Sequence, residues 1–201
     1  MEMQRVRRIA FCLFLFSAQL FAQSRKDTDR YAATGPVFEA SAGYLFMSMT
    51  SASTARLNRQ GIDVNGLVHF TPHWGGMVDF SFARAGNVPG TGHSDQVFSG
   101  LIGPMFYLVD HPKTNVFVNA LFGSAWVDSA VTLNATTEFH GYETRFSYLF
   151  GAGVERYVSG PFSVRLSGGY QRTTFVDSNL DLLGQNNLRV SAGIVYEFGR
   201  R

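Results

Sequence analysis

The stretch 186–198 is the part of the chain that most constrains its fold. It reads NNLRVSAGIVYEF, and every second residue from Leu188 to Phe198 is apolar. The residues between them include Arg189, Glu197 and two small side chains. Alternation with a period of two predicts a β-strand with one apolar and one polar face. The stretch is long for a soluble strand and matches a tilted strand that crosses a membrane.

The same alternation recurs along the chain. It predicts eight strands, at 38–47, 62–70, 76–83, 98–108, 116–126, 146–155, 164–171 and 188–198. Long polar connections follow the first, third, fifth and seventh strands, the longest being 129–144, and short ones follow the second, fourth and sixth. An even number of strands with this asymmetry predicts an all-β fold: an eight-stranded antiparallel up-and-down transmembrane β-barrel. The last strand should pair with 38–46 to close it.

The composition of the two faces favours a membrane barrel over a soluble one. The apolar face carries no charge except Arg156 and Arg172, which fall at strand ends. A charge near the bilayer midplane would cost about 2–4 kcal/mol, so lipid contact requires such a face. A soluble lipocalin-like barrel is the alternative, but its outer wall is polar and its cavity apolar, the reverse of this pattern.

The polar face predicts a charged barrel interior. Seven charged residues share it with Gly, Ser and Asn: Glu39, Asp63, Asp79, Glu155, Arg165, Arg189 and Glu197. The interior of an eight-stranded barrel has room only for side chains. We therefore expect Arg165 or Arg189 to pair with a glutamate, Glu39, Glu155 or Glu197. Acids outnumber arginines on this face, so the remaining carboxylates should contact His69, a polar side chain or water, or share a proton. A charged gate over a narrow water path is the functional alternative.

The N-terminus predicts export. Three arginines precede an apolar run, Ile9–Phe16, and a polar break, so residues 1–22 are interpreted as a signal peptide with cleavage after Ala22. Residues 23–35 are expected to form a flexible periplasmic lead-in and 36–201 the barrel domain. The signal holds three of the 17 basic and one of the 15 acidic residues, which leaves fourteen of each. A neutral mature chain has no nucleic-acid-binding character.

Three segments carry a resemblance to a known family. They are VHFTPHW at 68–74, Arg165 together with YQRT at 170–173, and NNLRVSAGI at 186–194. With them, the region from Pro36 to Gly199 resembles the eight-stranded outer-membrane β-barrels typified by the transmembrane domain of outer membrane protein A. The resemblance implies an outer-membrane location and a terminal strand that the assembly machinery reads, here with Tyr196 and Phe198 as the signal. We expect no peptidoglycan-binding domain after this barrel.

No catalytic, cofactor or metal site is expected. The five histidines are scattered and lack the spacing of a zinc motif. A lipid A deacylase-like enzyme needs a serine, a histidine and an acid, and two groups contain these residue types: His140, Glu143 and Ser147, and His93, Ser94 and Asp95. Neither has a nucleophile motif.

The sequence thus predicts a monomeric outer-membrane protein with a structural or interaction role. The two alternatives are a lipid-modifying enzyme and a small passive pore. The expected partners are outer-membrane lipid and, during biogenesis, periplasmic chaperones and the assembly machinery, after export through the general secretory pathway. The polar loops contain no sequence motif that identifies a binding partner.

Overall fold

Strands account for nearly all of the described chain, as the alternation predicts. The computed structural model describes residues 37–50, 56–86, 95–111, 113–134, 137–176 and 182–198. The strands are β1 (Val37–Thr50), β2 (Arg56–His69), β3 (Trp74–Ala85), β4 (Asp95–His111), β5 (Thr114–Asn134), β6 (Thr137–Ser159), β7 (Phe162–Val176) and β8 (Leu182–Phe198). Each contains one of the eight predicted strands, except that β2 ends at His69, one residue before the predicted 62–70. The described residues include no helix long and apolar enough to cross a membrane.

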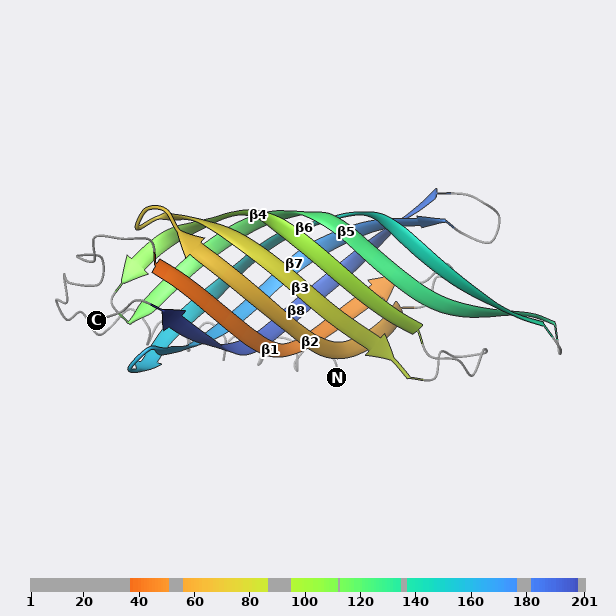
Figure 1. The fold of residues 1–201 in the computed structure, drawn as a ribbon, viewed down its shortest axis with the longest axis horizontal. Helices are drawn as coiled ribbons and strands as arrows, with labels where there is room; N and C mark the ends of the chain where they lie inside the picture. The colour runs from red at the N-terminus through yellow and green to blue at the C-terminus, as the bar shows by residue number, and fades with distance from the viewer. Residues whose placement is uncertain are drawn as a thin grey trace, which may run out of the picture. The chain divides into compact units, whose positions relative to one another are not determined.

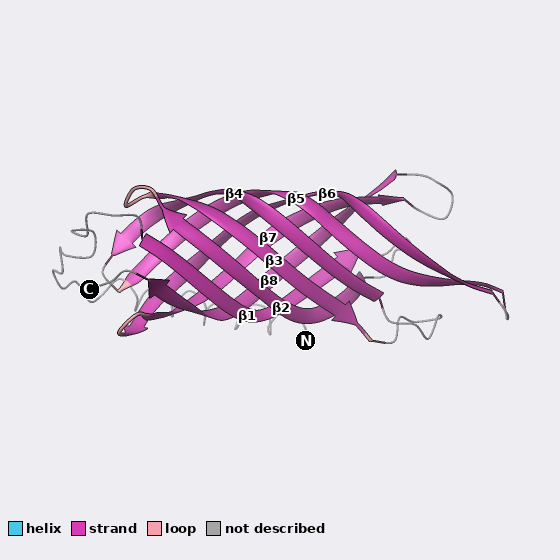
Figure 2. Cartoon of the chain, viewed as in Figure 1, coloured by secondary structure: helices cyan, strands magenta, loops and turns pink. Residues whose placement is uncertain are grey.

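The eight strands form one closed antiparallel barrel (Figures 1 and 2). Each strand pairs with its neighbours in sequence, and β1 also pairs with β8 from Phe38↔Phe198 onward, as expected. The three short connections lie at the end of the barrel that is on the left in Figure 1, which we call the turn end. The strand ends that the other four connections join lie at the opposite end, the loop end. Closure leaves no edge strand along the barrel wall, so every wall strand has two partners.

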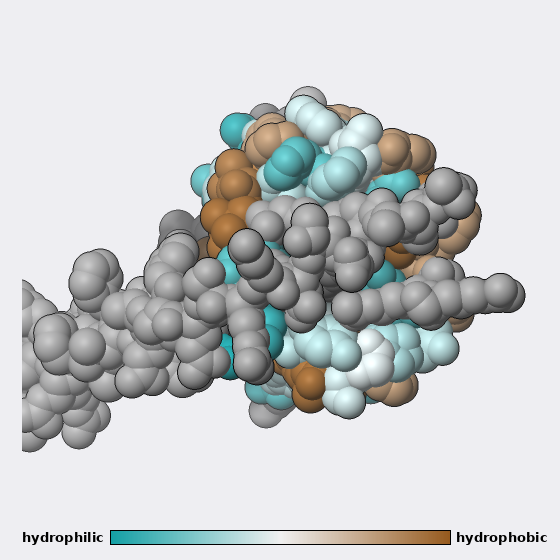
Figure 3. Space-filling view, turned by 90° about the vertical axis from the view of Figure 1, so that its left-hand side faces the viewer, coloured by the Kyte–Doolittle hydropathy of each residue, from teal (hydrophilic) through white to brown (hydrophobic). Residues whose placement is uncertain are grey.

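Side chains alternate between the outside and the interior all around the barrel. On β3 the burial pattern changes at every residue from Met77 to Ala85. The exposed side chains include 27 large hydrophobic residues, Ile62, Phe80 and Ile194 among them. Seen along the axis from the turn end, apolar side chains appear at several points of the circumference (Figure 3). An apolar exterior of this extent is typical of a membrane barrel rather than a soluble one.

Glycines in the interior allow strands to approach closely at the seam between β1 and β8. Gly43 and Gly193 face each other there in register. A Cβ atom on Gly43 would lie 2.6 Å from the carbonyl oxygen of Ala192 and 2.8 Å from Cα of Gly193. Both contacts are with backbone atoms, which cannot turn aside as a side chain could. Seam closure therefore depends on glycine at this point.

Two details differ from the sequence-based expectations. Pro104 lacks the backbone N–H that a strand ladder uses, so the sequence predicts a bulge or a local kink there. No bulge occurs, because β4 keeps one register with β5 from Ile102↔Phe122 to Met105↔Asn119. The pairing skips only Gly103 and Pro104, since a missing N–H removes a bond without inserting a residue. The register shifts instead between Tyr107 and Val109.

The second difference concerns the interval 129–144, which was expected to be the longest loop. The backbone there is mostly strand, because β5 and β6 continue to pair as far as Asn134↔Thr137. The last partners outside this hairpin are Gln96, opposite Asp128, and Thr173, opposite Ser147. The serine and threonine residues of this segment favour the prediction of a loop. A two-stranded ribbon in water, however, accommodates polar residues on both of its faces.

Replacing Gly43 with leucine should weaken barrel closure. The side chain would collide with backbone atoms of β8, at a cost of at least about 1–3 kcal/mol. The measurement is the fraction of protein that refolds into lipid vesicles as a protease-resistant species. Ala42→Leu is the matched control, since Ala42 is exposed on the outer face. Equal refolding of the two variants would contradict the seam-contact argument.

Candidate functional site: the charged barrel interior

The charged interior residues come from six of the eight strands. All seven predicted members are buried, with exposed fractions between 2% and 8%. Ionised groups that are removed from water require opposite charges and hydrogen bonds. The described structure supplies these in two clusters, one around Arg165 and one around Arg189.

The first group, the Arg165 cluster, lies toward the turn end. Arg165 Nη2 donates to Glu39 Oε2 at 2.6 Å and to Glu155 Oε2 at 2.7 Å, and its Nε donates to the same Glu155 oxygen at 3.2 Å. The guanidinium also lies over the ring of Phe117, 5.4 Å from its centroid. Glu39 is further held through Oε1, which lies 2.7 Å from Nε2 of His69. One arginine thus joins β7 to β1 and β6.

His69 is fixed on its other side by an aromatic ring. Its imidazole stacks on Tyr107, with ring centroids 5.3 Å apart and planes 20° from parallel. His69 is thus the partner of Glu39, and it is one of the partners expected for the carboxylates in excess of arginine.

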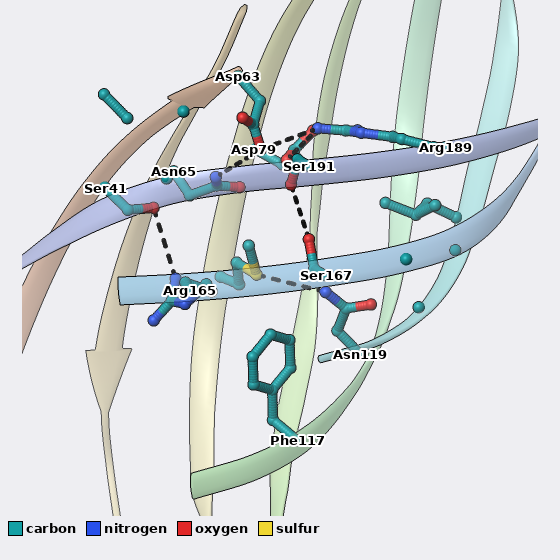
Figure 4. Close-up of a pocket in the computed structure, with 18 residues that line it drawn as sticks. Ser41, Asp63, Asn65, Asp79, Phe117, Asn119, Arg165, Ser167, Arg189 and Ser191 are labelled. Carbon is teal, nitrogen blue, oxygen red and sulfur yellow. Dashed lines mark hydrogen bonds and ion pairs between the residues drawn. The ribbon is translucent and has the colours of Figure 1, made fainter. Parts of the chain in front are cut away.

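The second group, the Arg189 cluster, spans the interior from β8 to β3. Arg189 Nη1 and Nη2 donate to the two oxygens of Asp79 at 2.7 and 2.8 Å, which is the bidentate geometry that arginine favours. Asp63 lies 3.6 Å from Nη2. Asn65 donates from Nδ2 to Asp63 at 3.2 Å and keeps that carboxylate in place. Figure 4 shows these groups converging from separate strands.

Interior glycines make room for both arginines. Gly193 stands opposite Arg165 in the register of β7 and β8, and Gly169 stands opposite Arg189. A neighbour without a side chain lets each guanidinium reach past its own strand. Gly169 is also constrained by packing, because a Cβ there would lie 2.8 Å from Cδ1 of Leu149 and 2.9 Å from the carbonyl oxygen of Phe150.

A cavity of about 30 Å³ separates the two clusters (Figure 4). Ser41, Asn65, Phe117, Asn119 and Arg189 are among its lining residues. A buried water needs a void of about 10–15 Å³ on this measure, so the cavity has room for one or two waters. The buried Oδ1 of Asn65 has no hydrogen-bond partner among the described residues and would accept from such a water.

Apolar side chains fill much of the rest of the interior. Toward the loop end, one cluster contains Leu45, Met47, Met49, Ala83, Val97 and Ala125. A second contains Leu67, Met77, Leu101, Met105, Tyr107, Phe117, Leu121 and Leu149. These residues stand at interior positions that the sequence analysis did not single out, although their period of two marks them. The described interior is therefore packed rather than lined with water.

The seven predicted charged residues all lie in the interior, and one of the two predicted arginines has partners other than the expected glutamates. Arg165 contacts Glu39 and Glu155, which are two of its three expected partners. Arg189 contacts Asp79 and Asp63 in place of a glutamate. Glu197 is buried and lies opposite Glu39 in the register of β1 and β8.

Tyr196 and Phe198, the predicted assembly signal, point outward at the turn end. They are 38% and 49% exposed, and their rings contact each other with centroids 4.6 Å apart. Phe162 of β7 packs against Tyr196 at 5.3 Å. This cluster forms part of an aromatic band at that end of the barrel. Recognition by the assembly machinery stays a prediction.

The described residues do not show either candidate group of serine, histidine and acid assembled. Ser147 is buried in the interior, accepts from Gln171 Nε2 at 3.0 Å and donates to the carbonyl oxygen of Arg172 at 3.2 Å. The side chains of the other five, His93, Ser94, Asp95, His140 and Glu143, lie outside the described residues. Within the described part of the chain, no group of His, Cys, Asp and Glu could hold a metal ion. Residues 1–36, which include the predicted signal and lead-in, also lie outside it.

Comparison with known proteins establishes the fold. No protein-family model and no curated protein sequence matches the chain. Neisserial surface protein A matches with a TM-score of 0.63 at 13% identity, over 82% of this chain and 99% of that one. Ail, the attachment invasion locus protein of Yersinia pestis, matches at 0.55 and 18% identity, over 82% and 100%. The outer membrane protein OprG of Pseudomonas aeruginosa matches at 0.51 and 9% identity, over 83% and 97%.

The chain has the fold of the eight-stranded outer-membrane barrels. The three proteins are similar to it over almost their entire lengths. At identities below 20%, this similarity concerns the path of the chain and not its activity. The fold implied by the resemblance in sequence is therefore confirmed.

Replacing Arg165 with methionine should strongly destabilise the barrel. Glu39 and Glu155 would be left buried without their cation, and breaking a buried pair in this way costs about 3–5 kcal/mol. The measurement is the free energy of unfolding by urea in lipid vesicles. Arg172→Met is the control, because Arg172 is exposed on the same strand, and its effect should stay within about 0.5 kcal/mol.

Adding Glu39→Gln and Glu155→Gln to Arg165→Met should restore part of the lost stability, because no buried charge is then uncompensated. A triple variant less stable than Arg165→Met would contradict the charge-balance account. So would an Arg165→Met variant as stable as Arg172→Met.

Proposed function

We propose that the protein is an integral outer-membrane barrel with a structural or interaction role, a packed polar interior and connections exposed at the loop end. The main observation that supports this proposal is a belt of exposed, uncharged apolar side chains around a charged, filled interior. On β8 the belt runs from Leu188 to Phe198. Ten residue steps at about 3.4 Å, tilted by about 40°, span about 26 Å along the barrel axis, which matches the apolar band of outer-membrane barrels.

The predicted signal peptide and the aromatic side chains support the same location. Trp74, Phe106, Phe162 and Tyr196 lie near the turn end, while Phe98, Trp126 and Phe146 lie nearer the loop end. Aromatic residues at two levels are typical of the two membrane interfaces. Export through the general secretory pathway would place the turn end in the periplasm.

The β5–β6 hairpin supports an interaction role. Its backbone pairing continues beyond the partners that β4 and β7 provide, so a two-stranded ribbon extends past the barrel at the loop end (Figure 1). Ail, of similar fold, has a structure in complex with a heparin analogue, sucrose octasulfate. The stretch 129–144 here has Glu138 and Glu143 but no Lys or Arg, so it is not suited to a polyanion of that kind.

The packed interior predicts little or no conductance. Arg165 and Arg189 each bridge separate strands, and apolar residues fill the space on both sides of the cavity. Planar-bilayer recordings of reconstituted protein should show small or no current steps. The control is protease resistance of the same preparation, which shows that the protein has inserted. Large, stable open channels would overturn the packed interior and favour the passive pore.

We also propose that the protein is not a lipid-modifying enzyme. Mass spectra of lipid A from cells with and without the protein should show the same acyl chains and phosphates. Ser147 makes two structural hydrogen bonds in the interior, where a lipid ester bond cannot reach it. A mass difference of one acyl chain that disappears in Ser147→Ala would instead support a deacylase.

A further inference from the structure

An apolar groove lies on the outer face of the barrel from the first residue of β3, Trp74, across to β7. Its volume is about 640 Å³, within the range of about 300–1,000 Å³ that ligand sites occupy. Its floor is a row of small side chains on adjacent strands, Val118, Ala152 and Gly168, which are consecutive partners in the register. Its walls include the rings of Phe106 and Phe150.

Gly168 leaves space in this groove that strand packing does not require. A Cβ at Gly168 would meet nothing closer than the carbonyl oxygen of Arg189, at 3.8 Å, which is ordinary contact. Gly151 and Gly153 of β6 differ, because a Cβ on either would lie about 2.4–2.5 Å from a neighbouring side chain. Larger residues would therefore fit at position 168, and glycine there keeps the groove open.

Two basic residues lie at the turn end below the groove. Arg156 is exposed on the outer face of β6, four residues beyond Ala152. Lys113 precedes Thr114, the register partner of Arg156, and its carbonyl oxygen accepts from the backbone N–H of Tyr157. Four residues along a strand tilted by about 40° place Arg156 about 10 Å below the groove along the membrane normal. No described carboxylate pairs with either side chain.

We propose that this groove binds one anionic phospholipid of the inner leaflet, with an acyl chain in the groove and its phosphate at Arg156 and Lys113. The inference rests on the outer-membrane location proposed above. Among the strand residues whose side chains are described, the exposed charged ones are Arg84, Arg156 and Arg172, all basic. Arg84 and Arg172 lie nearer the loop end, so the pair at the turn end faces the periplasmic leaflet, where the lipids are phospholipids. Basic residues near a membrane surface favour anionic headgroups.

The test uses native mass spectrometry of the full protein in detergent, titrated separately with phosphatidylglycerol and phosphatidylcholine of identical acyl chains. The wild type should retain one phosphatidylglycerol about fivefold more tightly than phosphatidylcholine. Arg156→Gln should remove most of that preference. Gly168→Leu should weaken retention of both lipids, because it fills the groove.

Two controls alter residues of the same kinds elsewhere. Arg172→Gln removes a basic residue at the other end of the outer face, and Ala192→Leu enlarges an exposed residue of β8 outside the groove. Neither should change lipid retention. Equal binding of the two lipids by the wild type, or equal losses in the controls and the groove variants, would overturn the proposal.

Protease-resistant insertion into vesicles is measured on every variant and separates the two claims. A protein that inserts but shows no lipid preference refutes the phospholipid site alone. A protein that does not insert refutes the membrane location, and the phospholipid site with it.

Discussion

Backbone hydrogen bonding inside a membrane is the constraint on which the structure depends. Strands can cross lipid only if every N–H and C=O has a partner, and a sheet achieves this by closing on itself. Closure through β1 and β8 fixes which residues point outward, because the side-chain period is two. Outward positions then need apolar residues, and among the described side chains of the barrel wall the charged ones lie in the interior or toward the strand ends. The chemistry of the interior thus follows from the need to close the wall.

Confinement of charge explains why arginine rather than lysine lies in the interior. Arg189 binds both oxygens of Asp79, and Arg165 holds two carboxylates at once. A lysine presents a single ammonium group and could not reproduce the planar fork. The chain has only two lysines, Lys26 and Lys113, and Lys113 lies in a turn. Arg165 and Arg189 each contact carboxylates on strands other than their own, so they also tie those strands together.

Strand positions, faces and barrel closure could be predicted from the sequence, because a period of two is a local property. The partner of Arg189 could not, since Asp79 lies across the barrel and its proximity depends on strand stagger. The interval 129–144 was misjudged because polar composition does not distinguish a loop from a ribbon in water. The sequence shows that Pro104 has no backbone N–H to donate. Only the structure shows that the pairing of β4 with β5 passes this residue without a shift in register. The groove around Gly168 required the structure, because it is formed by side chains on several strands.

The most direct test of the central claim is the electrophoretic mobility of the protein from an outer-membrane fraction, with and without boiling. A closed barrel resists detergent at room temperature, whereas boiling separates β1 from β8 and unfolds the wall. The account predicts that the unboiled sample migrates at a different position and shifts to the position of the full mass on boiling. A band in that fraction that does not shift on boiling would contradict the closed barrel.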